Sequence, residues 1–381
     1  MSGNINTYFQ KMVDHDASDL FITSGLAPSA KIDGQMTPLD ENVLDDAGAI
    51  AMVKSTMNEK QIKEFEETKE CNFAIANDIG RFRVSAFWQR DRAGMVCRRI
   101  VTEIPKADSL GLPPVLKDVI MSKRGLVLFV GATGTGKSTS LAALLGHRNH
   151  NSKGHILTIE DPIEFVHDHG KSLITQREVG LDTDSFDAAL KSSLRQAPDV
   201  ILIGEIRSQE IMEYALSFAE TGHLCVATLH ANNANQAIDR VLHLVPKELH
   251  AKLQFDLALN LRAIVAQQLV PTVDGKGRAA AIEILLNSPM VSELIKRGEI
   301  SSIKETMSKS RELGMQTFDQ ALFDHYEAGR ISYSDALHHA DSPNDLRLMI
   351  KLRSESKEGS EETSLLKGAT VEGLSKDEDQ F

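Results

Sequence analysis

Residues 131–138 constrain the fold of this chain more than any other segment. They read GATGTGKS, which matches the phosphate-binding loop pattern GxxxxGK[ST]. The apolar run LVLFV precedes them, and a helix-like stretch follows over 138–148. Glycines let the backbone N–H groups of such a loop face a phosphate chain, and the start of the following helix favours negative charge. The segment therefore predicts a strand, a nucleotide-binding P-loop and a helix in succession.

Individual residues of the predicted loop have different expected roles in nucleotide binding. Lys137 can reach the β and γ phosphates of a nucleotide, Ser138 can hold Mg²⁺, and Thr139 continues the helix. The predicted ligands are thus ATP and Mg²⁺. The residues predicted to bind them are Gly131, Ala132, Thr133, Gly134, Thr135, Gly136, Lys137, Ser138 and Thr139.

Four short runs after residue 120 are apolar on both faces, as buried parallel strands are. They are LVLFV at 126–130, HILTI at 155–159, DVILI at 199–203 and LCVATL at 224–229. Helix-like stretches at 138–148, 186–195 and 210–220 separate them. This alternation predicts an α/β fold with a parallel-rich sheet.

Acidic residues follow two of these runs. HILTI leads into Glu160, Asp161 and, beyond Pro162, Glu164, whereas DVILI leads into Glu205. Because ligands in such folds bind outside the carboxyl ends of the parallel strands, we expect these side chains near the nucleotide. Glu205 is expected to contact Mg²⁺, directly or through water, and Glu164 to orient or activate the attacking water. The sequence leaves open which of these two carboxylates activates the water.

Two histidines, His223 and His230, bracket the run LCVATL. Seven residues apart on one strand, they are too distant to bind one metal ion. Each is interpreted either as a hydrogen-bonded structural residue or as a catalytic residue that senses the γ-phosphate.

The chain divides into four predicted parts. Residues 1–100 mix helical and strand-like stretches, and 101–120 carry the proline and glycine punctuation of a linker. The P-loop and the apolar runs lie within 121–353. The remaining segment, 354–381, holds eight acids against three lysines and few large apolar residues, which predicts a disordered acidic tail.

One strand-like run in the first part, RFRVSAF, alternates between apolar and polar residues. Residues at every second position of a strand share a face. The run therefore predicts an apolar face made of Phe82, Val84 and Ala86 and a second face made of Arg81, Arg83 and Ser85.

Charge and cysteine usage exclude several classes of protein. The net charge of −12 lacks the positive field of a nonspecific nucleic-acid binder, so no nucleic-acid partner is expected. No stretch of 18 apolar residues runs without a charge, which argues against a transmembrane segment. Three scattered cysteines and the absence of a secretory signal favour a cytoplasmic protein.

Four motifs, in this order, resemble those of the type II/IV secretion and type IV pilus ATPases. GATGTGKST, TIEDPIEF, ILIGEIR and TGHLCVATLH are similar to the family's Walker A, Asp box, Walker B and His box. The likeness extends to SDLFIT, GRFRVSAF, TQREVG and GMQTFDQAL, and it points to the pilus retraction branch. It implies a PAS-like N-terminal α+β domain and a RecA-like P-loop ATPase core with C-terminal helices.

The resemblance also implies an assembly. Family members of this branch form homohexamers at the cytoplasmic face of the inner membrane and act on the inner-membrane pilus platform protein to retract pili, which is the basis of twitching motility. Arg81, Arg83 and Arg98 lie where the family places arginines that reach the nucleotide phosphates. The stretch MVSELIKRGE replaces the AIRNLIRE motif of the principal retraction ATPase. The chain is therefore expected to assist a PilT-like retraction ATPase.

Other functions remain open at this point. A hexameric motor stimulated by nucleic acid would share the same core, although the acidic composition argues against it. A regulatory partner that binds ATP and turns it over slowly would also carry these motifs. A pilus assembly motor of the same family is a further candidate, but such motors often carry a four-cysteine zinc site, which three cysteines cannot supply.

Overall fold

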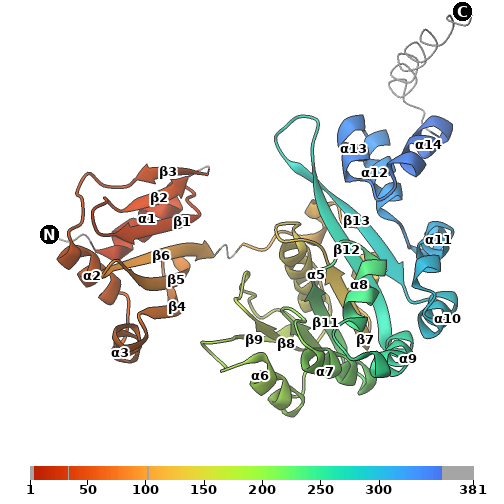
Figure 1. Cartoon of the computed structure of the whole chain (residues 1–381), viewed down its shortest axis with the longest axis horizontal. Coiled ribbons are helices and arrows are strands. Elements are labelled where there is room, and N and C mark those ends of the chain that lie inside the picture. Colours follow the sequence, from red (N-terminus) through yellow and green to blue (C-terminus); the bar gives the residue numbers. More distant parts are fainter. Residues whose placement is uncertain (1–3, 33, 101–102, 354–381) are drawn as a thin grey trace, which may run out of the picture. The chain divides into compact units, whose positions relative to one another are not determined.

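A computed structural model describes residues 4–32, 34–100 and 103–353. It divides into two compact units (Figure 1). The first unit comprises residues up to 104 together with 161–168 and 176–189, and the second comprises 105–160, 169–175 and the residues from 190 onward. The predicted tail at 354–381 and residues 101–102 of the predicted linker lie outside the described residues.

An antiparallel sheet of six strands forms the centre of the first unit, in the order β3-β2-β1-β6-β5-β4 (Figure 1). Its strands are β1 (Asp19–Thr23), β2 (Ser29–Ile32), β3 (Gln35–Pro38), β4 (Glu70–Asn77), β5 (Gly80–Gln89) and β6 (Arg92–Ile100). The helices of this unit are α1 (Ile5–Asp14), α2 (Asp46–Lys54) and α3 (Glu59–Thr68).

The predicted alternation of β5 is confirmed. Phe82, Val84 and Ala86 are buried, whereas the arginines and Ser85 of this strand lie on its other face. Phe9 of α1 stacks on Phe82, with ring centroids 4.0 Å apart and ring planes 9° from parallel. Both rings are fully buried, so this pair anchors the helix on the sheet.

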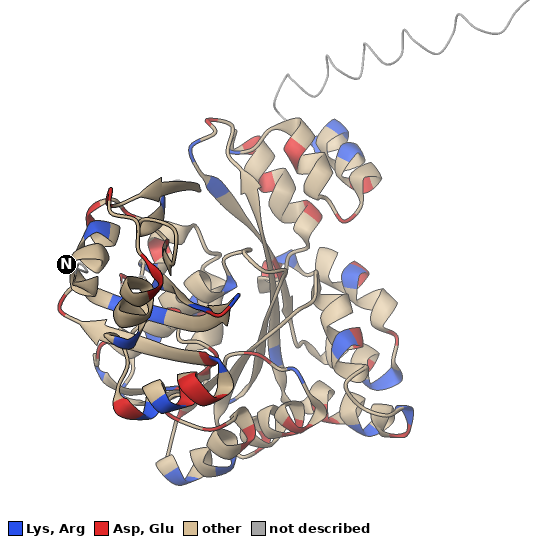
Figure 2. Ribbon diagram, turned by 60° about the vertical axis from the view of Figure 1, so that its left-hand side comes forward, with Lys and Arg blue, Asp and Glu red and all other residues tan. Residues whose placement is uncertain are grey.

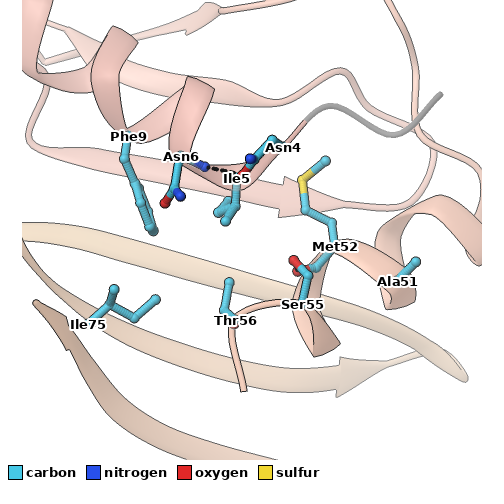
Figure 3. Close-up of a pocket in the computed structure, with 9 residues that line it drawn as sticks. All are labelled: Asn4, Ile5, Asn6, Phe9, Ala51, Met52, Ser55, Thr56 and Ile75. Carbon is cyan, nitrogen blue, oxygen red and sulfur yellow. Dashed lines mark hydrogen bonds between the residues drawn. The ribbon is translucent and has the colours of Figure 1, made fainter. Parts of the chain in front are cut away.

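A pocket of about 360 Å³ opens in the first unit among residues of α1, α2 and β4 (Figure 3). Three of its polar side chains make local hydrogen bonds. The Asn4 side chain caps α1, while the hydroxyls of Ser55 and Thr56 donate to the carbonyls of Met52 and Val53. These three groups thus stabilise helix ends. The fourth, Asn6, accepts a hydrogen bond at Oδ1 from Asn77 Nδ2 at 3.3 Å.

The second unit is built on a sheet of seven strands in the order β13-β12-β7-β11-β10-β8-β9. The neighbours β12, β7, β11, β10 and β8 are parallel, and β13 is antiparallel to β12. The strands are β7 (Gly125–Val130), β8 (Gly154–Glu160), β9 (Ser172–Glu178), β10 (Val200–Ile203), β11 (Leu224–Leu229), β12 (Leu261–Pro271) and β13 (Arg278–Leu286). The predicted α/β fold with a parallel-rich sheet is therefore confirmed.

Helices connect the strands and complete the C-terminal part (Figure 1). The connecting helices are α4 (Val115–Ile120), α5 (Lys137–Asn151), α6 (Phe186–Ser193), α7 (Gln209–Glu220), α8 (Ala234–Leu242) and α9 (His250–Asn260). The C-terminal helices are α10 (Pro289–Arg297), α11 (Ile303–Ser308), α12 (Phe318–Glu327), α13 (Tyr333–His339) and α14 (Pro343–Arg353). Leu294 and Ile295, from the stretch MVSELIKRGE, are buried on α10. Within the described ranges no helix has both the length and the apolar character needed to span a bilayer.

Replacing Phe82 by alanine is expected to destabilise the first unit by roughly 3–5 kcal/mol, because a large cavity would face Phe9. Urea unfolding followed by Trp88 fluorescence measures this loss, since Trp88 lies on β5 and is the chain's sole tryptophan. Ser85→Ala, on the exposed face of the same strand, is the matched control and should shift stability by less than about 0.5 kcal/mol. Equal losses in the two variants would contradict the packing account.

Candidate active site

Four neighbouring parallel strands end at one edge of the large sheet. Val130 at the end of β7 pairs with Leu229 of β11. Ile203 at the end of β10 pairs with Ala227 on one side and Ile159 of β8 on the other. The P-loop, His230, Glu205 and Glu160 therefore leave the sheet from the same edge, as parallel strands in adjacent positions require.

The P-loop connects β7 to α5, which confirms the predicted strand, loop and helix. Lys137, the first residue of α5, folds back over the loop. Its Nζ lies 2.8 Å from the Gly131 carbonyl and 2.7 Å from the Ala132 carbonyl. The Thr135 hydroxyl also donates to the Ala132 carbonyl, at 2.9 Å. The loop is thus closed around a cationic side chain.

Gln267 of β12 lies directly against the P-loop. A Cβ on Gly131 would lie 2.6 Å from the Gln267 carbonyl oxygen, and a Cβ on Gly136 would lie 2.8 Å from its Nε2. Gly136 also has φ +83°, a conformation that L residues rarely adopt. Gln267 is buried, and its Oε1 has no hydrogen-bond partner within the described ranges. Sequence reasoning missed this contact, although a glutamine inside an apolar run was a visible signal.

Glu205 is held between two basic side chains just beyond β10. Its Oε2 accepts a hydrogen bond from Arg207 Nε at 2.7 Å, and its Oε1 lies 3.2 Å from His230 Nε2. The Glu205 side chain is 20% exposed, compared with 54% for Arg207 and 51% for His230. The Thr228 hydroxyl donates to the Gly204 carbonyl, which ties the two strand ends together. The structure therefore brings the predicted Glu205 and His230 into contact.

The other predicted acids divide between the two units. Glu160 ends β8 in the second unit, and its Oε1 accepts a hydrogen bond from the buried Thr158 hydroxyl at 2.6 Å. Asp161 and Glu164 are exposed and belong to the first unit. Glu160 thus joins Glu205 at the sheet edge, and the catalytic roles of all four acids stay predictions.

Glu178 organises the segment that carries Glu164. Its buried carboxylate accepts the Ile163 N–H at 3.3 Å and lies 3.4 Å from Arg81 Nη2. All these residues belong to the first unit. Glu178 lies within TQREVG, but nothing in the sequence singled it out as the partner of an arginine about 100 residues away.

The three predicted phosphate-binding arginines differ in their surroundings. Arg98 of β6 pairs through Nε with the buried Asp19 at 2.8 Å, and Arg81 pairs with Glu178. Arg83 lies opposite Arg98 in the register of β5 and β6. Among the described residues, no ion pair involves Arg83. Its guanidinium is therefore the one of the three best able to bind a phosphate.

The two predicted catalytic histidines lie at opposite ends of β11. His223 precedes the strand, where its Nδ1 lies 3.2 Å from the Phe218 carbonyl and 3.1 Å from the Thr221 hydroxyl. At about 3.3 Å per residue the strand separates it from His230 by roughly 20 Å. The structure therefore does not bring His223 to the edge where Glu205 lies, because a strand bracketed by two residues presents them at opposite edges of the sheet.

Comparisons with known proteins identify the family to which the chain belongs. The model of the family described as type II/IV secretion system protein matches residues 2–323, and the chain belongs to this family.

Within this family, the chain is similar to ATPases of type IV pili. The type IV pilus ATPase PilU of Pseudomonas aeruginosa is 59% identical, over 95% of this chain and 94% of that protein. The type IV pilus retraction ATPase PilT of the same organism is 41% identical, over 86% of this chain and 96% of PilT. A crystal structure of the pilus retraction motor PilT with bound ADP superposes with a TM-score of 0.86 and 36% identity, covering 91% of this chain and all of that one.

Gly136→Ala is expected to destabilise the second unit more than Gly134→Ala. Both glycines have positive φ, for which an L residue costs about 1–2 kcal/mol. Only the Gly136 variant adds a close contact, with Gln267, because no atom lies within 4 Å of a Cβ at Gly134. Calorimetric melting of both variants measures the difference, and a loss at Gly134 equal to that at Gly136 would refute the importance of the contact.

Proposed function

We propose that this chain hydrolyses ATP with Mg²⁺ and, as a homohexameric motor, assists the retraction of type IV pili beside a PilT-like ATPase. The observation that carries the proposal is the Glu205 carboxylate, held by Arg207 and His230 at the sheet edge from which the P-loop emerges. The family match and the likeness to PilU and PilT support it.

Nucleotide binding is assigned to the P-loop. The backbone N–H groups of residues 132–139 and the start of α5 favour the phosphates of ATP, and the Lys137 ammonium exchanges its loop carbonyls for phosphate oxygens. The Ser138 hydroxyl would hold Mg²⁺ directly and the Glu205 carboxylate would hold it through a water molecule, since Mg²⁺ prefers oxygen ligands and retains several waters. The donor set therefore fits this ion. Bound Mg²⁺ would offset negative charge on the phosphate oxygens.

Hydrolysis needs a group that accepts a proton from the attacking water. We assign this role to Glu205, which is partly buried, accepts a hydrogen bond from Arg207 and lies 3.2 Å from His230 Nε2. The water oxygen forms a bond to the γ-phosphorus as the bond to the ADP oxygen breaks. His230 holds the Glu205 carboxylate in orientation, and Glu164 is the second candidate for activating the water.

The arginines and the assembly complete the proposal. Arg83 is proposed to contact nucleotide phosphates, while Arg81 and Arg98 support it from ion pairs within the first unit. The hexamer would work at the cytoplasmic face of the inner membrane on the pilus platform protein. In this proposal the first unit is a PAS-like domain and the second is a RecA-like core.

Charge distribution does not favour the nucleic-acid motor. Figure 2 shows acidic and basic residues interspersed along the described helices and strands. The sequence carries 54 acidic against 42 basic residues. A channel that tracks a phosphate backbone gathers positive charge together with stacking aromatic side chains, and aromatic residues make up only 5% of this chain.

Lys137→Ala and Glu205→Ala are each expected to lower Mg²⁺-dependent ATP turnover at least about a hundredfold, because they remove phosphate binding and proton acceptance. Phosphate release by the purified chain measures this, with and without single-stranded DNA and with and without PilT. Lys252→Ala, an exposed lysine on α9, is the matched control and should keep wild-type turnover. Strong stimulation by DNA would replace the pilus motor with a nucleic-acid motor, and absence of turnover throughout would leave an ATP-binding partner of PilT.

Glu205→Gln and Glu164→Gln distinguish the two candidate bases. The variant that loses the base should retain ATP affinity within about threefold while kcat falls by orders of magnitude. We expect this behaviour of Glu205→Gln and a smaller loss of kcat from Glu164→Gln. Fluorescent-nucleotide titration beside steady-state kinetics gives both quantities, and the reverse order would assign the base to Glu164.

A further inference from the structure

Four charged side chains form a cluster in the second unit, two of them buried and two partly exposed, and none takes part in the proposed hydrolysis. Its members are Glu283 of β13, Lys304 of α11, Asp319 of α12 and Asp341, which lies between α13 and α14. Glu283 is 2% exposed and Asp319 is 4% exposed. Buried charges are costly unless they are paired and hydrogen-bonded, so the cluster needs an explanation.

Lys304 and Asp319 tie the C-terminal helices together. Lys304 Nζ lies 2.8 Å from Asp341 Oδ2 and 3.7 Å from Asp319 Oδ2. Asp319 Oδ1 accepts the backbone N–H groups of Asp341 at 2.9 Å and Ser342 at 3.3 Å. In the described part of the chain, the Lys304 ammonium is therefore the single positive charge beside the carboxylates of Asp319 and Asp341, and Glu283 adds a third carboxylate to the cluster.

Glu283 lies at the start of two helices. Its Oε1 accepts the N–H of Ala234, the first residue of α8, at 2.7 Å. The backbone N–H of Phe318, the first residue of α12, also favours its ionised form. Helix N-termini stabilise a carboxylate, yet burial dominates here and raises the pKa of Glu283 to about 7, with Asp341 raising it further and Lys304 lowering it.

The same helix start adjoins His230. Asn233 caps α8 by accepting the Gln236 N–H, and its Nδ2 donates to Asp341 Oδ2 at 3.5 Å. His230 stands three residues earlier, against Glu205. The short segment 230–233 is therefore fixed at one end by Glu205 and at the other by carboxylates from β13 and from the segment before α14.

We propose that Glu283 is a positioning residue whose negative charge fixes the start of α8, and with it His230 against Glu205, and so links this pair to helices α11 and α12. The catalytic part of this inference rests on the proposed ATPase function. The groups that face Glu283 are the N–H groups of Ala234 and Phe318, the Lys304 ammonium and the Asp341 carboxylate. Asp319 approaches the same ammonium, at 3.7 Å. Above pH 7 the cluster holds one more negative charge than below it.

Glu283→Gln tests the charge, because glutamine keeps the size of the side chain and the oxygen that accepts the Ala234 N–H. The wild-type kcat for ATP should rise through an inflection near pH 7, and the variant should lack that inflection. At pH 6 the two proteins should agree within about twofold. At pH 8 the variant should be about three- to tenfold slower, with KM changed less than about twofold. A variant that is slower by one factor at every pH would reduce Glu283 to a structural residue and overturn the proposal.

A second readout does not need ATP hydrolysis. Because its folded pKa is raised, Glu283 contributes stability below its unfolded value near 4.3 that is lost as pH rises to about 7. The melting midpoint of Glu283→Gln relative to wild type should therefore rise between pH 5 and pH 8, while hydrogen exchange of the Ala234 amide becomes faster in the variant at pH 8.

Glu305→Gln, an exposed carboxylate of α11, is the control and should change neither quantity. If the wild-type chain hydrolyses no ATP, the proposed function fails while melting and exchange still decide the role of Glu283. A pH-independent melting difference with unchanged exchange would overturn that role.

Discussion

The close approach of the P-loop backbone to β12 is the constraint on which the candidate site depends. A Cβ on Gly131 would lie 2.6 Å from the Gln267 carbonyl oxygen, and a Cβ on Gly136 would require the buried Gln267 amide to shift. The approach in turn requires β12 to lie parallel and adjacent to β7 in the sheet. The geometry of the P-loop thus depends together on the strand order, the glycine spacing and the position of Lys137. A change in any one of them would disturb the loop.

Much of this arrangement could be predicted from the sequence, since strong local patterns coincided. Runs apolar on both faces predicted parallel strands, and the P-loop fixed which sheet edge binds ligands. Strand direction alone then places His230 and His223 at opposite ends of β11. The motif resemblance groups both histidines in one His box and so does not indicate this separation. Glu178 and Glu283 could not be predicted, because their partners lie far away in the sequence and each residue sits in an ordinary local pattern. Gln267 is visible as a polar residue within an apolar run, but the run does not indicate that it lies against the P-loop.

The arginines of β5 and β6 also show what a local sequence pattern can and cannot predict. Alternation in β5 predicted correctly which side Arg81 and Arg83 share. It could not show that Asp19 would hold Arg98, because that contact depends on β1 pairing with β6 across about 80 residues of chain. Arginines that look equivalent in the sequence pattern therefore differ in whether an ion pair already holds their guanidinium. The order of strands in the sheet decides which of them are paired.

The division of the chain into its two compact units has a further consequence. Residues 161–168 and 176–189 make their contacts with the first unit although they lie between elements of the second. The polypeptide therefore passes from one unit to the other five times, after residues 104, 160, 168, 175 and 189. A fragment cut within the linker would strip the segment around Ile163 and Glu178 of the surface on which it folds. Neither unit is therefore a continuous stretch of sequence, and no single cut in the chain would release either of them whole.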